Sequence, residues 1–357
     1  MINVTKTFLP PKEEYDRILE EIWHSNQIAN GGKLHLELRK KLKERLEVDN
    51  IILTANGTLP LQIALNLLGD EGEIITTPFS YVATTSSIVW EKCTPVFVDI
   101  HPDFLTIDEK KIEEAITPRT TLILATHVFG NPCNVEIIEK IARKHSLKVV
   151  YDAAHCFGIK YKKQSIFNYG DLSTCSFHAT KLFHTGEGGA MITKDEKLYQ
   201  QLFYRHNFGH AGELAYYGLG INAKMSELQA GMGLAVLQYV DSIIANHKKV
   251  AEWYDFYLKF NGYRKPSIRK FTEWNYSYYP VIFESAQLLL KIQKKLNENR
   301  VFPRRYFYPS LNKLPYVTAV KMEISEITAD RIMCLPLAFD LQEKEVKEIC
   351  RIINSCI

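Results

Sequence analysis

The strongest constraint on the fold is an alternation between short apolar runs and longer amphipathic runs over the first two-thirds of the chain. The apolar runs lack the polar alternation of a strand that has one face in water, so they predict strands buried on both faces. Buried strands separated by helices indicate an α/β fold with a mainly parallel central sheet. The predicted strands are residues 51–54, 73–77, 95–100, 121–127, 147–155, 171–178 and 188–193.

The amphipathic runs predict helices at residues 57–69, 82–91, 108–116 and 134–145, and one long helix from Met225 to about Phe260. The last hundred residues read as mixed strand and helix. A chain of 357 residues is long enough for two domains. We therefore predict a large domain over residues 1–240 and a smaller C-terminal α+β domain over residues 241–357.

Composition excludes several classes of function. The 44 basic and 41 acidic residues are interleaved, which leaves no basic stripe for nucleic acid. No apolar run approaches the ~20 residues that cross a bilayer. The seven cysteines are scattered without a CxxC pair, which is typical of a reduced, cytoplasmic protein. His206 and His210 have no third ligand nearby, so we expect no metal site.

Ligands of open parallel sheets bind beyond the carboxyl ends of the strands. After the first predicted strand comes Asn56-Gly57-Thr58, which opens a helix. Glycine allows close approach of the backbone to an anion, and the helix N-terminus supplies N–H groups for a phosphate. The same three residues are also compatible with an ordinary helix cap.

Asp152 ends another apolar run, and His155 follows three residues later. A carboxylate in this position needs a cation or an N-cap role, because burying it unpaired is costly. One cation that fits is the protonated ring nitrogen of pyridoxal phosphate (PLP), which requires an acidic partner to remain an electron sink. His155 is suited to lie beside such a ring, or to be a hydrogen-bonded core histidine.

Lys181 lies in the stretch CSFHATKLFHTGEGGAMIT, among small and aromatic residues. Burial lowers the pKa of a lysine, and a neutral amine forms a Schiff base with an aldehyde. Ser176 is suited to hold a phosphate, and the Gly-Glu-Gly-Gly run allows a tight turn beside it. Phe79 is a candidate for stacking on the ring, and Asn222 for capping a helix or reaching the phosphate.

The order of these motifs resembles the sugar-nucleotide aminotransferases of the DegT/DnrJ/EryC1/StrS family. NGT, TPFSYVATTSSI, VYDAAHCFG, SFHATKLFHTGEGGAMIT and GINAKMSELQAGMGL carry the resemblance, which runs over essentially the whole chain. It implies the fold of the aspartate aminotransferases (fold type I), PLP held by a lysine, and a homodimer with active sites at the subunit interface.

The resemblance also implies a role for each matching residue. Lys181 is the catalytic lysine, Asp152 pairs with the pyridine nitrogen, and His155 lies near the phenolic oxygen of the ring. The resemblance implies that the cofactor phosphate is held by Gly57, Thr58, Ser176 and the partner's Asn222. It also implies that Phe79 stacks on the cofactor ring and that the sugar contacts Glu187 and Tyr308. Ala223 and Lys224 depart from the Tyr-Arg of many relatives, so the pocket edge near Lys224 is expected to differ.

The opening VTKTFLPP with the later Asn-Gly-Gly resembles the branch that aminates C4 of dTDP-4-dehydro-6-deoxy-D-glucose, with L-glutamate as donor, for bacterial surface polysaccharides such as the lipopolysaccharide O-antigen. Two alternatives stay open: amination of C3 of a dTDP-3-dehydro-6-deoxyhexose, and a PLP-fold regulator without turnover. A nicotinamide enzyme is disfavoured, because no GxGxxG follows the first strand.

Overall fold

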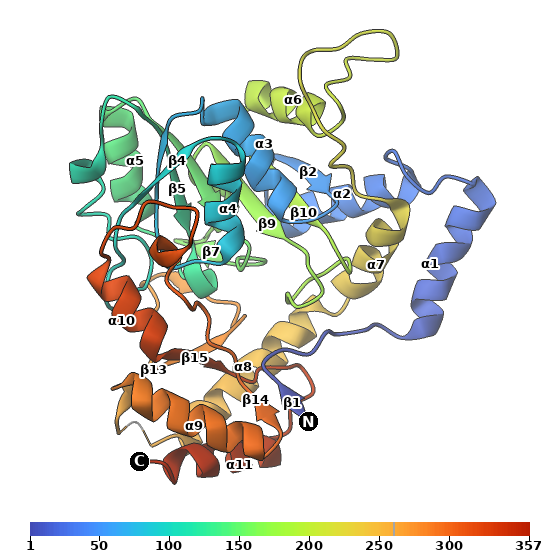
Figure 1. Ribbon diagram of the computed structural model, residues 1–357. Coiled ribbons are helices and arrows are strands. Elements are labelled where there is room, and N and C mark those ends of the chain that lie inside the picture. Colours follow the sequence, from blue (N-terminus) through green and yellow to red (C-terminus); the bar gives the residue numbers. More distant parts are fainter. Residues whose placement is uncertain (260) are drawn as a thin grey trace.

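The computed structural model describes residues 1–259 and 261–357, which form a larger and a smaller lobe (Figure 1). The larger lobe contains a seven-stranded sheet in the order β2-β10-β9-β6-β5-β3-β4. All of its strands run in one direction except β10, which is antiparallel to both neighbours. The predicted α/β fold with a mainly parallel sheet is therefore confirmed. The strands are β2 Asn50–Thr54, β3 Glu73–Thr76, β4 Thr94–Phe97, β5 Thr120–Thr126, β6 Lys148–Asp152, β9 Leu172–Ser176 and β10 Gly189–Thr193.

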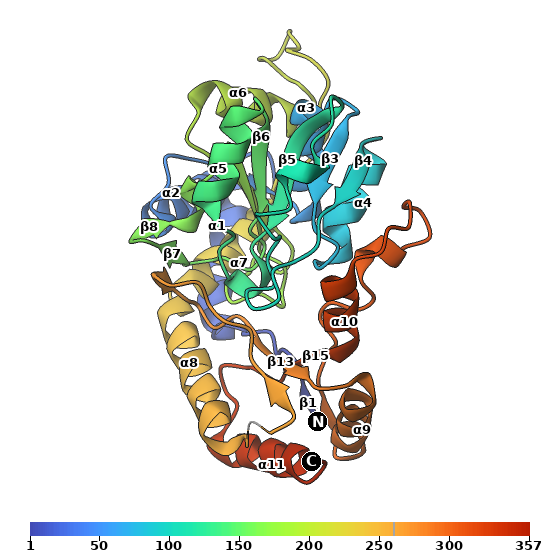
Figure 2. The same ribbon diagram turned by 90° about the vertical axis from the view of Figure 1, so that its left-hand side faces the viewer.

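Helices cover both faces of this sheet, which explains why its strands are apolar throughout. Ile75 packs in a core with α2 (Lys33–Leu46), α5 (Val135–Lys144) and α7 (Glu227–Leu237). Its neighbour Ile74 packs in a second core. Figure 2 shows this layered arrangement from the side. The second core also receives side chains from α3 (Thr58–Leu68), α4 (Val82–Trp90) and α6 (Glu196–Arg205).

Two of the predicted helices are wrong in detail. Residues 108–116 form only a 3₁₀ turn at Glu113–Ala115, because the Asp108 carboxylate accepts from the Lys110 amide and turns the chain. The predicted long helix is two helices, α7 and α8 (Val240–Tyr257), bent by 60°. The bend lets α7 pack on the large sheet while α8 continues into the smaller lobe. Phe260, the predicted helix end, lies outside the described residues.

The smaller lobe is a three-stranded antiparallel sheet packed on helices. β13 (Tyr279–Phe283) lies between β11 (Tyr263–Arg264) and β15 (Ile332–Leu335). The core of this lobe begins at Val250 in α8, which supports a domain boundary near residue 240; that boundary stays a prediction. The helices of the lobe are α9 Ala286–Glu298, α10 Glu323–Arg331 and α11 Glu343–Asn354.

The N-terminal segment connects the lobes. β1 (Ile2–Asn3) pairs in parallel with β14 (Val301–Phe302), so the first residues belong with the smaller lobe, while α1 (Lys12–Ser25) packs against α7. The small strands β7 (Lys160–Tyr161), β8 (Gln164–Ser165) and β12 (Thr272–Glu273) form a separate sheet.

Across the described ranges, no single helix is long and apolar enough to span a bilayer; α7 and α8 reach the required length only as a bent pair.

Candidate active site

A cavity of about 640 Å³ opens where the carboxyl ends of the large sheet face the smaller lobe. Strands β2, β9, β6, β5 and β3 share one direction, so the loops that follow them meet at this edge. The smaller lobe closes the other side. The lining residues used below are Asn56, Gly57, Thr58, Tyr81, Asp152, His155, Ser176, His178, Lys181, Glu187, Tyr278, Arg304, Tyr306 and Phe307.

The turn after β2 packs tightly against β9 and β10. A Cβ on Gly57 would lie 2.8 Å from the Ser176 Cβ, and a Cβ on Gly189 would lie 2.5 Å from the Asn56 carbonyl oxygen. The Asn56 side chain accepts from the amides of Thr58 and Leu59 at 2.9 and 3.0 Å. The capping interpretation therefore holds for Asn56, while Gly57, Thr58 and Ser176 form a small polar concavity at a helix N-terminus.

Asp152 ends β6 and is only 5% exposed. Its Oδ2 accepts from the Thr84 hydroxyl at 2.7 Å, and its Oδ1 accepts from the Ala154 amide at 3.2 Å. Burial raises the pKa of this carboxyl, and the hydrogen bond from Thr84, the Ala154 amide and the charge of Lys181 act in the opposite direction.

His155 is buried among aromatic rings. Its Nδ1 accepts from the Phe129 amide at 3.2 Å, so the neutral ring carries its proton on Nε2. Burial holds the pKa of His155 well below its ordinary value, and the charge of Lys181 lowers it further. The ring lies parallel to that of Phe307, with centroids 5.9 Å apart. A neutral imidazole with a fixed tautomer is thus available beside the cavity.

Lys181 projects into the same cavity. Its Nζ donates to the hydroxyl of Tyr278 at 3.3 Å, which links the turn after β9 to the smaller lobe. Burial lowers the pKa of this amine, and nearby Tyr306 and Asp152 partly offset that shift. The structure therefore brings Lys181, Asp152 and His155 together around one cavity.

Phe79 does not occupy the place predicted for it. It is fully buried, packs edge-on against Phe129 and Phe307, and does not line the cavity. Tyr81, two residues later, does line it and is 51% exposed. The residues after β3 therefore place Phe79 in the core and Tyr81 at the cavity, which corrects the position predicted for Phe79.

The outer part of the cavity is polar and more exposed. The His178 Nε2 lies 3.6 Å from the Glu187 Oε1. The Arg304 guanidinium covers the ring of Tyr306, whose pKa is raised to about 12 by burial, so that its hydroxyl stays protonated. Tyr308 lies in an adjoining hollow of about 140 Å³ that shares Tyr81 and Arg304 with the main cavity.

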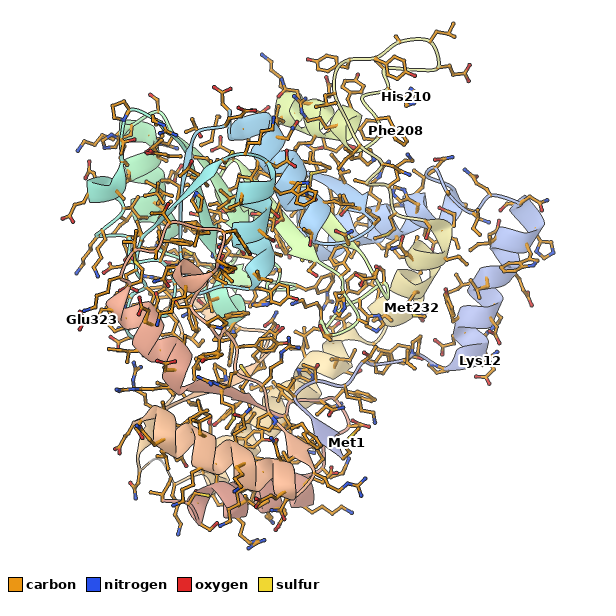
Figure 3. All side chains as sticks on the ribbon, in the orientation of Figure 1. Met1, Lys12, Phe208, His210, Met232 and Glu323 are labelled. Carbon is orange, nitrogen blue, oxygen red and sulfur yellow. The ribbon has the colours of Figure 1, made fainter. Side chains whose placement is uncertain are left out.

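Asn222 and Lys224 lie outside this cavity, on the return arm of a loop between α6 and α7 that projects beyond the sheet. Figure 3 labels Phe208 and His210 on the outgoing arm. Asn222 forms a bridge with Asn207, and the Lys224 Nζ donates to the Asn207 Oδ1 at 2.8 Å. Asn222 is not the cap of α7, since Ser226 forms that capping box.

Comparison with known proteins assigns the fold and the site to a family. The model of the DegT/DnrJ/EryC1/StrS aminotransferase family matches residues 11–354. The chain belongs to this family. It is 40% identical to the dTDP-4-amino-4,6-dideoxy-D-glucose transaminase of Shigella dysenteriae, over 99% of this chain and 98% of that protein.

Two further relatives agree with that assignment. This aminotransferase is 30% identical to the GDP-perosamine synthase of Escherichia coli O157:H7, over 96% of this chain and 94% of that protein. The crystal structure of DesI in the presence of its TDP-sugar product superposes with a TM-score of 0.94 at 28% identity, over 99% of this chain and 92% of that one. The cofactor of the aminotransferase is pyridoxal phosphate.

Sequence reasoning missed several lining residues of this aminotransferase. Tyr81 lies two residues after Phe79 in the TPFSYVAT segment, and the sequence pattern does not distinguish the two aromatic residues. Arg304 and Tyr306 lie four and two residues before Tyr308, the one residue of this segment that the resemblance indicates. Tyr278 gave no local signal, because its position beside Lys181 depends on how the two lobes pack. Among the residues that the structure describes, no group of three or more metal-binding side chains is found.

Proposed function

We propose that this aminotransferase transfers the amino group of L-glutamate to C4 of dTDP-4-dehydro-6-deoxy-D-glucose, giving dTDP-4-amino-4,6-dideoxy-D-glucose. The observation that carries the proposal is the position of Lys181 and Asp152 in one cavity of a chain that is 40% identical, end to end, to a transaminase named for that amino sugar. The product is destined for a surface polysaccharide such as the lipopolysaccharide O-antigen, and the seven unpaired cysteines support a cytoplasmic location.

The cavity fits the cofactor in shape and in donor chemistry. Gly57, Thr58 and Ser176 offer a phosphate a concavity that a side chain at Gly57 would fill. Asp152 offers a buried carboxylate to the pyridine nitrogen, and Tyr81 an exposed ring for stacking. When bound, pyridoxal phosphate supplies a carbonyl group that carries nitrogen and a ring that accepts electrons.

The residues of this chain have separable tasks. Lys181 holds the cofactor and moves a proton to and from the reacting carbon, which the lowered pKa of its amine favours. Asp152 keeps the ring nitrogen protonated, and His155 orients the ring from the side. Phe307 and Tyr278 restrict water access near the amine.

The outer part of the cavity holds the sugar nucleotide. Arg304 carries no ion pair with a carboxylate in the described part of the chain, so its charge is available for a diphosphate. Glu187, Tyr306 and Tyr308 supply polar groups for sugar hydroxyls.

We also propose a homodimer in which Asn222 and Lys224 complete the cavity of the partner subunit. These residues do not reach the cavity of their own chain. The loop that bears them exposes Leu214 at 98% and Leu219 at 71%, apolar surface that a second subunit would cover. Light scattering of the purified protein tests the dimer, and Asn222→Ala should weaken PLP binding.

The decisive experiment supplies ¹⁵N-labelled glutamate with dTDP-4-dehydro-6-deoxy-D-glucose and, separately, with its 3-dehydro isomer. Product NMR locates the labelled nitrogen. Label at C4 supports the proposal, and label at C3 favours the 3-aminotransferase alternative. If neither sugar receives label while PLP is bound, the chain acts as a regulator instead.

A second experiment tests the role of Lys181 directly. Acetic anhydride modifies only neutral amines, so Lys181 of the PLP-free enzyme should be acetylated at lower pH than the lysine of an unstructured reference peptide, because burial lowers the Lys181 pKa. Peptide mass spectrometry across a pH series reads Lys181 and the reference peptide. Equal pH dependence of the two would contradict the proposed activation of Lys181.

A further inference from the structure

Three buried hydroxyl groups form a chain that ends on Asp152. The Thr126 Oγ1 donates to the Ser80 Oγ at 3.1 Å, the Ser80 Oγ lies 2.8 Å from the Thr84 Oγ1, and the Thr84 Oγ1 donates to the Asp152 Oδ2 at 2.7 Å. None of the four residues is more than 5% exposed. They come from the end of β5, the loop after β3, the first turn of α4 and the end of β6.

The direction of every hydrogen bond in this chain is fixed by its last member. An ionised carboxylate only accepts, so the single hydroxyl hydrogen of Thr84 is given to Asp152. Ser80 must then donate to Thr84, and Thr126 to Ser80. All three O–H dipoles therefore point toward the carboxylate, and each strengthens the next.

The chain of hydroxyl hydrogen bonds opposes the effect of burial on the ionisation of Asp152. Asp152 is nearly free of solvent contact, and burial alone favours the neutral acid. A neutral acid could not pair with a protonated ring nitrogen. The hydrogen bond from Thr84 is the largest influence that favours the ionised form, ahead of the Ala154 amide and the charge of Lys181.

The position of Thr84 fits this role better than a role in helix stability. A threonine inside a helix commonly bonds a backbone carbonyl one turn earlier. The Thr84 hydroxyl bonds Ser80 and Asp152 side chains instead. Its neighbour Thr85 is equally buried, yet the Thr85 Oγ1 has no hydrogen-bond partner among the described residues. These adjacent, equally buried threonines of one helix therefore differ in their links to Ser80 and Asp152.

We propose that Thr84, aligned by Ser80 and Thr126, is a positioning residue that keeps the Asp152 carboxylate ionised and aimed at the pyridine nitrogen of the bound cofactor. The proposal rests on the proposed function, because it requires PLP in the cavity.

The test compares Thr84→Val, Thr84→Ser and the matched control Thr85→Val. PLP-free enzyme is titrated with PLP to obtain Kd, and the pyridine ¹⁵N shift of labelled, enzyme-bound PLP reports ring protonation. Thr84→Val should weaken PLP binding by about tenfold, since a hydrogen bond to a charged group is lost, and move the ¹⁵N shift toward that of the unprotonated ring. Thr84→Ser and Thr85→Val should retain wild-type values.

Ser80→Ala is a second variant that tests the same inference if Thr84→Val folds poorly. It removes the hydrogen bonds that Ser80 makes with Thr126 and Thr84 and leaves the bond from Thr84 to Asp152 in place. The Kd should therefore rise by about threefold, with a smaller ¹⁵N change in the same direction. Wild-type values for both Thr84→Val and Ser80→Ala, or equal losses in Thr84→Val and Thr85→Val, would overturn the inference and leave the proposed function intact. A wild-type enzyme that binds no PLP would overturn both.

Discussion

The cavity has a floor and a wall that are built differently. The floor comprises Gly57, Asp152, Ser176 and Lys181, which end or follow strands of one sheet and are held by backbone packing and hydrogen bonds. The wall comprises Tyr81, Arg304, Tyr306 and Tyr308, which are partly or largely exposed. The rings of Tyr306 and Tyr308 lie against the guanidinium groups of Arg304 and Arg305. The floor is positioned by the fold itself, and the wall by loops of two lobes.

This difference separates chemistry from recognition. A residue at the end of a buried strand cannot move without displacing its neighbours, so the floor suits groups that must be placed within a fraction of an ångström. Loop side chains change at little cost to the fold. We infer that the floor carries what the family shares. The wall residues other than Tyr81, which is proposed to stack on the cofactor, carry the choice of sugar, and the following variants can break or sharpen this division.

The largest effect is expected at Lys181. Lys181→Ala removes both the group that holds the cofactor and the proton carrier, so the turnover number should fall by at least about 10³-fold. Steady-state assays with glutamate and the keto sugar measure the loss, and Lys294→Ala, an exposed lysine on α9, is the control. A Lys181→Ala enzyme that keeps a tenth of wild-type activity would place the chemistry elsewhere.

The floor residues can be predicted from the sequence, because the signal for each one lies in its immediate sequence neighbourhood. Asp152 and Ser176 each end an apolar run, and Gly57 opens the helix after another, so the parallel-sheet rule alone brings them to one edge. The same rule predicted the sheet itself. It could not predict the bend between α7 and α8, which depends on which lobe each helix packs against.

The wall residues are harder to predict from the sequence, because tertiary packing determines which side chains reach the cavity. Phe79 and Tyr81 are both aromatic and lie two residues apart, and only the fold shows which one is enclosed by Phe129 and Phe307. Tyr278 reaches Lys181 from the other lobe, across 97 residues of sequence. Periodicity carries no information about such contacts.

The second-largest effect is expected at Arg304, in the wall. Arg304→Ala should raise the KM for the sugar nucleotide by about thirtyfold, the value of one lost hydrogen bond between charged groups, and change the glutamate half-reaction by less than about twofold. The two half-reactions are followed separately by the absorbance of the cofactor. Arg351→Ala on α11 controls for lost charge. Equal losses in both half-reactions would mean that Arg304 acts in the chemistry common to both, as the floor residues do, and not in binding the sugar nucleotide.

Tyr81 and Phe79 should respond in opposite ways. Tyr81→Ala should weaken PLP binding by about three- to tenfold, the value of one aromatic stacking contact, with little change in stability. Phe79→Ala should lower the free energy of unfolding by about 3–5 kcal/mol, because it leaves a cavity in the core. PLP titration and urea unfolding of both variants measure these effects. Selective loss of PLP binding in a stable Phe79→Ala enzyme would restore Phe79 as the stacking residue.

The smallest effect is expected at Tyr308, at the rim of the wall. The Arg305 guanidinium lies over its ring, 3.6 Å from the ring centroid, and Tyr308 lines the adjoining hollow rather than the main cavity. Tyr308→Phe removes the hydroxyl and keeps the stack, so the KM for the sugar nucleotide should rise by less than about threefold, the weaker end of a neutral, solvent-accessible hydrogen bond. Tyr308→Ala also removes the stack and should raise the KM further. Since Tyr308 does not line the cavity that contains Lys181, the turnover number should stay within twofold of wild type. A large fall in turnover for Tyr308→Phe would show that the rim also positions the reacting carbon, and that floor and wall act as one unit.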